Sequence, residues 1–202
     1  MEEIKLWFTL WVSPRETMRE ILQKAPNFRL WLLSTLYGLG FGWLLSLSFP
    51  TGFSLPFFII ATILSPLVGY VLFSFTGYLF YLTGKWIGGQ GSFQAVRSSV
   101  AWGSIPPIVN YILLIILALV VGTYHIPSLI QNFGANVGAD IVFVIIGVLY
   151  AIVGIWGLII WLFLLAEAQG FSFWKSVLNV IIGLALFFII VFILMLLVSF
   201  VL

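Results

Sequence analysis

Residues 88–109 read GGQGSFQAVRSSVAWGSIPPIV and separate two long apolar blocks. The glycines at the start disfavour a continued helix, and the hydroxyl of Ser92 is placed to cap a new one. An apolar helix face follows at i, i+3 and i+7, made of Phe93, Val96 and Val100. Because Arg97 falls on the opposite, water-facing side, the stretch predicts a short amphipathic helix in the plane of a membrane surface.

The end of the same stretch predicts that the chain re-enters the membrane. Trp102 is placed where an aromatic ring marks the level of the lipid headgroups. Pro106 and Pro107 then open the next apolar block. These prolines, and Pro66 in the preceding block, are expected to kink or break their helices.

The composition excludes a water-soluble fold. Of the 202 residues, 63% are hydrophobic and 7% are charged, whereas soluble domains carry about 25% charged residues. The fold class is therefore all-α, a polytopic membrane protein. The chain has no cysteine and one histidine, which excludes a thiolate metal site and a cysteine nucleophile. With no catalytic constellation in the sequence, we expect no enzyme, no cofactor and no metal site.

Five apolar blocks are long enough to cross a bilayer, which takes about 17–25 residues. They cover residues 30–49, 55–82, 105–121, 141–165 and 177–201. We expect one transmembrane domain over residues 30–202, packed as one bundle, after a cytosolic segment of residues 1–29. Small residues repeated on one side of a helix permit close packing. They are Gly38, Gly40 and Gly42; Gly69, Gly77 and Gly84; and Gly147, Ala151 and Gly154.

The basic residues predict the orientation. Residues 1–29 hold five of the eight Lys and Arg residues, the loop after the second block holds two, and the loop after the fourth block holds one. The other two loops hold none. By the positive-inside rule, five crossings place the N-terminus in the cytosol and the C-terminus outside or in a lumen.

Residues 1–29 predict two amphipathic helices at the membrane interface. The first, too short to span a bilayer, is apolar except for a narrow polar stripe, and its Trp7 and Trp11 are expected at headgroup depth. The second begins at Ser13-Pro14-Arg15-Glu16, the pattern of a capping box with proline at the first helical position. The basic segment is expected to contact anionic lipid headgroups, with about 1 kcal/mol from each Lys or Arg.

Three motifs flank the crossings. They are Trp11-Val-Ser-Pro-Arg-Glu-Thr-Met; Gly91-Ser-Phe-Gln-Ala-Val with Ala101-Trp-Gly-Ser-Ile-Pro; and Trp161 to Glu167 with Gln169-Gly-Phe-Ser. The second and third motifs are alike, since each has a glycine, a serine cap and a short polar stretch before a crossing. With these motifs the chain resembles the Yip1-domain family, which implies a small five-helix membrane protein with a cytosolic N-terminus.

The same resemblance bears on partners and location. Eukaryotic members are linked to vesicle traffic at the endoplasmic reticulum and Golgi, with Rab GTPases as partners, and generally have longer cytosolic N-terminal regions. The short segment here argues against a GTPase partner and looks more like a bacterial or archaeal member. The implied location is the plasma membrane of a prokaryote, or the endoplasmic reticulum or Golgi of a eukaryote. No nucleic-acid partner is expected, and a homo-oligomer stays open.

Asn110 lies one turn inside the third block, just after Pro106 and Pro107. One interpretation is a polar site beside a broken helix, where freed carbonyls and an amide meet a lipid headgroup or a solute. The other is an interhelical hydrogen bond, which we favour because such bonds are common in membrane bundles.

Glu167 closes the fourth block on the cytosolic side. It is either a proton or cation site, or a carboxylate that reaches headgroup water, Lys175 or Arg97, and we favour the latter. Asp140 fits the N-terminus of the fourth helix, and His125 has too few potential co-ligands for a metal site. The candidate binding residues are Arg97, Trp102, Pro106, Pro107, Asn110 and Glu167.

Two functions fit these observations. The first, which we favour, is a non-enzymatic scaffold or adaptor that acts on membrane organisation or traffic through its cytosolic amphipathic helices. The second is a transporter or scramblase of a lipid or small solute, with the broken second and third helices as the path. A polar groove lined by Asn110, Tyr70, Ser74 and Glu167 favours transport, and a sealed bundle favours a scaffold.

Overall fold

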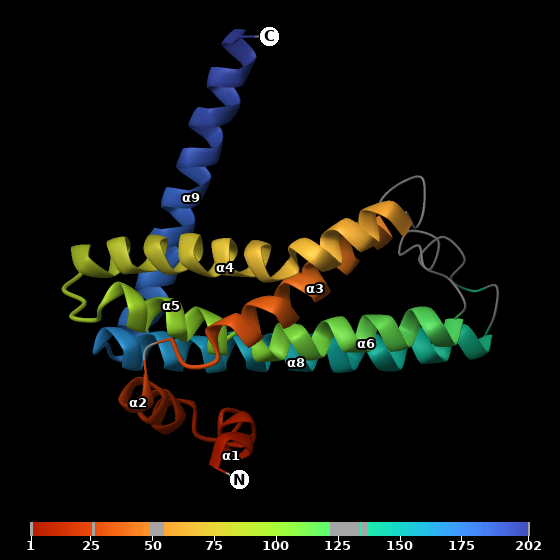
Figure 1. Cartoon of the computed structure of the whole chain (residues 1–202), viewed down its shortest axis with the longest axis horizontal. Coiled ribbons are helices and arrows are strands. Elements are labelled where there is room, and N and C mark those ends of the chain that lie inside the picture. The colour runs from red at the N-terminus through yellow and green to blue at the C-terminus, as the bar shows by residue number, and fades with distance from the viewer. Residues whose placement is uncertain (1, 26, 49–54, 122–133, 135–136, 202) are drawn as a thin grey trace. The chain divides into compact units, whose positions relative to one another are not determined.

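The computed structural model describes residues 2–25, 27–48, 55–121, 134 and 137–201, and all regular structure in them is α-helical. The helices are α1 (Glu2–Thr9), α2 (Pro14–Lys24), α3 (Leu30–Ser48), α4 (Leu55–Trp86), α5 (Phe93–Trp102), α6 (Ile105–Val121), α8 (Val137–Gln169) and α9 (Phe173–Val201), labelled in Figure 1. The all-α class is confirmed. Each predicted apolar block coincides with one helix, because long apolar runs leave a membrane chain no other hydrogen-bonded structure.

Four helical stretches in the described part of the chain are long and apolar enough to cross a membrane. They are α4, the run Phe93–Val120 that takes in α5 and α6, α8, and α9 up to Ser199. The searched part of α3, Leu30–Leu45, is apolar but shorter than a span. The fifth crossing and the orientation of the termini therefore stay predictions.

The helices gather into two compact units. Unit 1 comprises Met1–Phe28, Ser74–Val100 and Ile160–Leu202, and unit 2 comprises Arg29–Phe73 and Ala101–Ile159. The N-terminal helices thus share a unit with α9. The single five-helix bundle stays a prediction.

In unit 2 the backbones of α3 and α4 approach each other closely. A side chain at Gly38 would collide with the carbonyl oxygen of Ser65, and one at Gly69 would collide with that of Ser34. This is the packing that small residues permit between membrane helices. On α8 the pattern differs from the prediction, since Gly147 has no described neighbour within 4 Å, whereas Gly157 lies against Pro106.

The prolines affect their helices in two ways. Of the two effects predicted at Pro66, a break does not occur, because α4 continues through this residue as one helix. Pro66 cannot donate to the carbonyl of Thr62, and the hydroxyl of Ser65 donates to that oxygen instead, at 2.8 Å. At Pro106 and Pro107 the break is confirmed: α5 ends at Trp102, and the prolines lie in the first turn of α6, where a missing N–H costs no helical bond.

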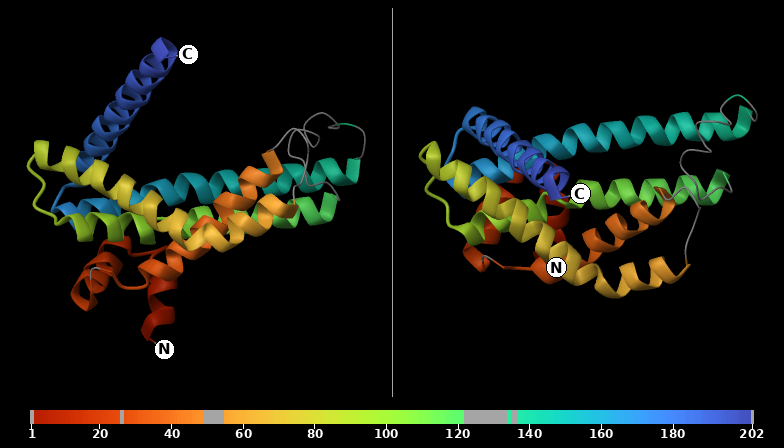
Figure 2. Two further views of the ribbon diagram at one scale, coloured as in Figure 1. Left: turned by 45° about the horizontal axis from the view of Figure 1, so that its top comes forward. Right: turned by 90° about the horizontal axis from the view of Figure 1, so that it is seen from above.

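Two similar connections meet in unit 1, one between α4 and α5 and one between α8 and α9. The N–H of Gln90 donates to the carbonyl of Gln169 at 3.0 Å. The predicted serine caps are both present, because Ser92 Oγ accepts from the N–H of Ala95 at 3.1 Å and Ser172 Oγ accepts from that of Lys175 at 3.4 Å. Beyond these connections α9 extends away from the other helices of its unit (Figures 1 and 2), and no described side chain from residue 184 to 199 is buried.

Candidate functional site: docked N-terminal helices

The N-terminal helices are joined to each other by a short hydrogen-bonded turn. α2 begins at Pro14 as predicted, but within the described residues the Ser13 side chain makes no cap bond. Its carbonyl oxygen instead lies 2.9 Å from the hydroxyl of Thr17, which also lies 2.9 Å from the hydroxyl of Thr9 in α1. The predicted capping bond of Ser13 was therefore wrong, and the hydroxyls of Thr9 and Thr17 are what link the two helices.

One face of these helices is part of the core of unit 1. Four apolar side chains are fully buried, namely Leu6, Leu10, Met18 and Ile21. Burial of a side chain of this size stabilises by about 1.5–3 kcal/mol relative to exposure. Residues 2–25 are therefore held by the protein itself, whereas the sequence predicted a pair of helices lying in the lipid interface.

The polar face of α2 contacts the last turns of α8. Nε of Arg19 donates to Oε1 of Glu167 at 2.9 Å, and the guanidinium of Arg15 lies over the ring of Phe163, 5.5 Å from its centre. Both pairs are spaced by four residues on both helices, so two successive turns are matched. The ion pair itself is worth about 0–1 kcal/mol, because 61% of the Arg19 side chain is exposed. The pair mainly fixes the register of α2 against α8.

Glu167 therefore has a different partner from those predicted. Lys175 and Arg97 were its nearest candidates along the membrane-spanning part of the chain, but α2 folds back and supplies Arg19. Within α2 itself a local pair is present, since Lys24 Nζ lies 2.9 Å from Glu20 Oε1, four residues earlier. Helical spacing reveals such local pairs, whereas the Arg19 pair joins residues 148 positions apart.

A second contact joins the end of the N-terminal segment to α5. Nη2 of Arg97 donates to Oδ1 of Asn27 at 2.6 Å, and Nη1 lies 3.4 Å from the hydroxyl of Ser74. The guanidinium also lies 5.2 Å from the ring centre of Phe93. Arg97 is buried rather than water-facing, so the predicted wet face of α5 was wrong. Gly77 makes room for it, since a Cβ there would come within 2.9 Å of the Arg97 Cα.

A cluster of buried amides ties α4, α8 and α9 together, and the sequence analysis missed it. The side-chain amides of Gln169 and Asn179 both donate to the carbonyl of Phe80, at 2.9 and 3.1 Å. The hydroxyl of Thr83 donates to Oδ1 of Asn179 at 2.7 Å. An asparagine inside the apolar fifth block was the available signal. Polar bonds between helices are a common source of specificity in membranes.

Replacing Gln169 with glutamate tests this cluster with almost no change of shape. The new oxygen cannot donate to the Phe80 carbonyl unless it is protonated, and a carboxylate at this fully buried position is costly. We expect a loss of more than about 3 kcal/mol of unfolding free energy, measured by thermal unfolding in detergent. Gln90→Glu is the matched control, because Gln90 is exposed in the similar connection; equal losses in both variants would contradict the cluster.

The remaining predicted residues lie in unit 2. Trp102 is fully buried within the protein, so its ring packs on other side chains, and its predicted level in the membrane stays a prediction. Asn110 is 6% exposed, and its Oδ1 has no hydrogen-bond partner among the described residues. Asn110 and the buried Pro106 both face α8, beside Gly154 and Gly157; Pro107 is half-buried.

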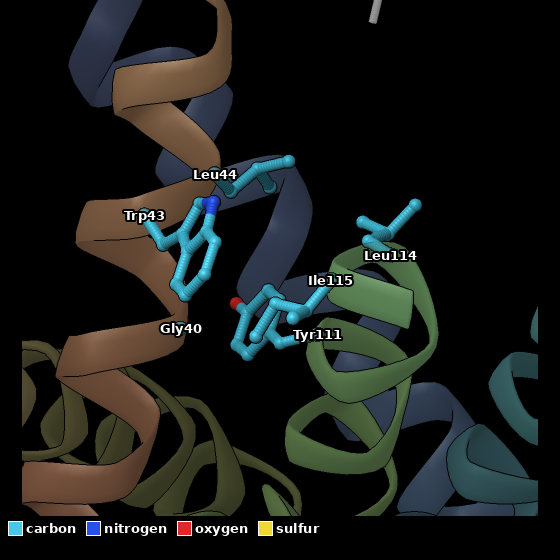
Figure 3. A pocket seen from close by; sticks show the side chains of 6 residues that line it. All are labelled: Gly40, Trp43, Leu44, Tyr111, Leu114 and Ile115. Carbon is cyan, nitrogen blue, oxygen red and sulfur yellow. The ribbon is translucent and has the colours of Figure 1, made fainter. Parts of the chain in front are cut away.

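A small cavity lies between α3 and α6. Figure 3 shows Trp43 and Tyr111 facing the same space, which is also lined by Gly40, Leu44, Leu114 and Ile115. Its volume is about 10 Å³, which is the size of one water molecule. The ring of Tyr111 packs directly on Gly40, so the space is apolar and narrow.

The N-terminal end of α8 forms a separate feature. Asp140 lies in the first turn, as predicted, and its Oδ2 accepts from the N–H of Gly134 at 3.0 Å. His125 lies outside the described residues. Within the described ranges no three His, Cys, Asp or Glu side chains are placed to hold a metal ion.

Comparison with known proteins identifies a family. The family model described as Yip1 domain matches residues 8–196, which is nearly the whole chain. No curated protein and no solved structure matches. The match begins within α1 and ends within α9, so it includes the docked N-terminal helices as well as the long apolar helices. With a family match of this extent and helices that are long and apolar enough to cross a membrane, the chain is an integral membrane protein that belongs to the Yip1 family.

Proposed function

We propose that the chain is a non-enzymatic membrane scaffold or adaptor that acts through residues 1–28. The observation that supports this most is the matched contact of Arg15 and Arg19 with the end of α8. It holds an amphipathic segment beside the membrane-spanning helices, where the segment presents a defined surface to partners. In this proposal α3 is the first of five crossings, and the N-terminus lies in the cytosol.

The contacts favour a scaffold over a transporter. The polar residues expected along a path have other neighbours: Ser74 lies beside Arg97, Tyr70 stacks on Trp31 at 4.8 Å, and Glu167 pairs with Arg19. A scaffold needs only rigid helices and an accessible surface.

Reconstituted liposomes test the proposal through vesicle shape and lipid flipping. We expect the native chain to change vesicle shape in electron cryomicroscopy and to leave the flipping of fluorescent lipids at the rate of empty liposomes. Arg19→Glu places two carboxylates together and weakens docking, so the shape change is expected to diminish. Arg19→Glu combined with Glu167→Arg restores an attractive pair and is expected to restore the shape change.

Two results would contradict this function. One is lipid flipping above that of empty liposomes that falls in Asn110→Leu, which would support the transporter instead. The other is a shape change that is identical in the native chain, the single variant and the charge-swapped variant. Gln23→Glu serves as the control for added negative charge, because Gln23 is exposed on α2.

A further inference from the structure

Helix α1 is apolar on two faces, and only one of them is covered by the protein. Leu6 and Leu10 are fully buried, whereas Ile4 is 63% exposed and Phe8 is 71% exposed. Ile4 and Phe8 are four residues apart and so lie on one side of the helix. Val12, 84% exposed, lies in the turn that follows α1. We call these three residues the outer stripe; an amphipathic helix that only packed on the protein would have no need of it.

Contacts within unit 1 place the outer stripe near the level of a membrane surface. α1 is joined to α2 through Thr9 and Thr17, and α2 is bound to Glu167. Glu167 lies two positions before the end of the apolar run Val137–Gln169, where such a helix meets the headgroups. α1 is therefore held at the end of a membrane-spanning helix and not in the bulk cytosol.

Aromatic and basic side chains mark the same end of the unit. Lys85 and Trp86 close α4, and Trp174 and Lys175 open α9; all four are exposed. Tryptophan beside lysine at the end of an apolar helix is typical of the headgroup region. The charge of unit 1 also suits an anionic surface, because the unit holds seven Lys and Arg residues against five Glu residues, and Lys5 is exposed next to Ile4.

We propose that the outer stripe inserts into the boundary between headgroups and acyl chains of an anionic leaflet while Leu6 and Leu10 remain packed in the protein. α1 would then bridge the transmembrane helices and the leaflet, as a shallow wedge fixed in position by α2. The proposal rests on the scaffold function proposed above and names its partner, a bilayer surface rich in anionic lipid.

The absence of cysteine from the chain permits a direct test by site-directed spin labelling. A nitroxide is attached to Phe8→Cys in the full chain, reconstituted in nanodiscs of phosphatidylcholine alone or with phosphatidylserine. We expect the label in the anionic discs to be severalfold more accessible to oxygen, and severalfold less accessible to a water-soluble nickel chelate, than in the neutral discs. Added salt is expected to reduce the difference, since it screens the exposed charges.

Gln23→Cys is the matched control, because Gln23 is exposed and polar on α2 and its label is expected to stay accessible to nickel in both lipids. A Phe8 label as accessible to nickel in anionic discs as in neutral ones overturns the proposal. Protection of the Phe8 label from nickel that occurs only in discs with two copies of the chain, together with spin–spin broadening, also overturns the proposal. It would indicate a contact between copies. If the label stays in water while the charge swap still restores vesicle shape, the leaflet contact is wrong and the scaffold function stands.

Discussion

Replacing Ile21 with aspartate is expected to release residues 1–28 from unit 1. Ile21 is fully buried on the docked face of α2, where an unpaired carboxylate costs several kcal/mol. A local opening made easier by about 3 kcal/mol raises the open population roughly a hundredfold. Because proteolysis tracks the open population when reclosing is fast, trypsin cleavage at Arg15, Arg19 and Lys24 should accelerate by a similar factor.

Limited proteolysis of the purified chain in detergent measures this effect. Gln23→Asp adds the same charge on the exposed side of α2 and should be cleaved at the native rate. The long apolar helices should stay intact in both variants, because their backbone bonds lie within each helix. Equal cleavage of native chain and Ile21→Asp would show that the N-terminal helices are not docked.

Replacing Gly69 with alanine is expected to destabilise unit 2. The added Cβ would collide with the backbone carbonyl of Ser34 on α3, and a backbone atom cannot move aside as a side-chain end can. Overpacking of this kind costs about 1–3 kcal/mol. The loss should appear as a lower melting temperature in detergent, measured by the fraction that remains monodisperse after heating.

Gly147 provides the control for this substitution. No described atom lies within 4 Å of a Cβ built there, and alanine favours a helix over glycine by up to about 1 kcal/mol. Gly147→Ala should therefore be neutral or stabilising. A melting temperature that falls equally in both variants would contradict the close packing of α3 and α4.

Hydropathy and spacing predicted the helices well. Each apolar block forms a helix with similar ends. The predicted helix starts are also confirmed at Ser92, Pro14 and the Pro106–Pro107 pair. These signals are local, since each depends on residues within a few turns. The same holds for the Lys24–Glu20 pair.

Contacts between distant segments were not predictable in this way. Nothing in the spacing of α5 indicates that Arg97 reaches Asn27 and becomes buried, or that Glu167 meets Arg19. Exposure to water was inferred from polarity, but a polar face can also pack on another polar segment. Gln169 was missed for the same reason. It belongs to the polar motif Gln169-Gly-Phe-Ser, which was expected to face water, but its side chain donates to the Phe80 carbonyl.

The most direct test of the docked arrangement is a cross-link between positions 19 and 167. In the cysteine-free chain, Arg19→Cys with Glu167→Cys is treated in membranes with a short bifunctional thiol reagent, and Gln23→Cys with Glu167→Cys is the control. Docking of α2 on α8 predicts an efficient intramolecular cross-link for the first pair and little for the second. Absence of the 19–167 cross-link, or equal yield from both pairs, would contradict it.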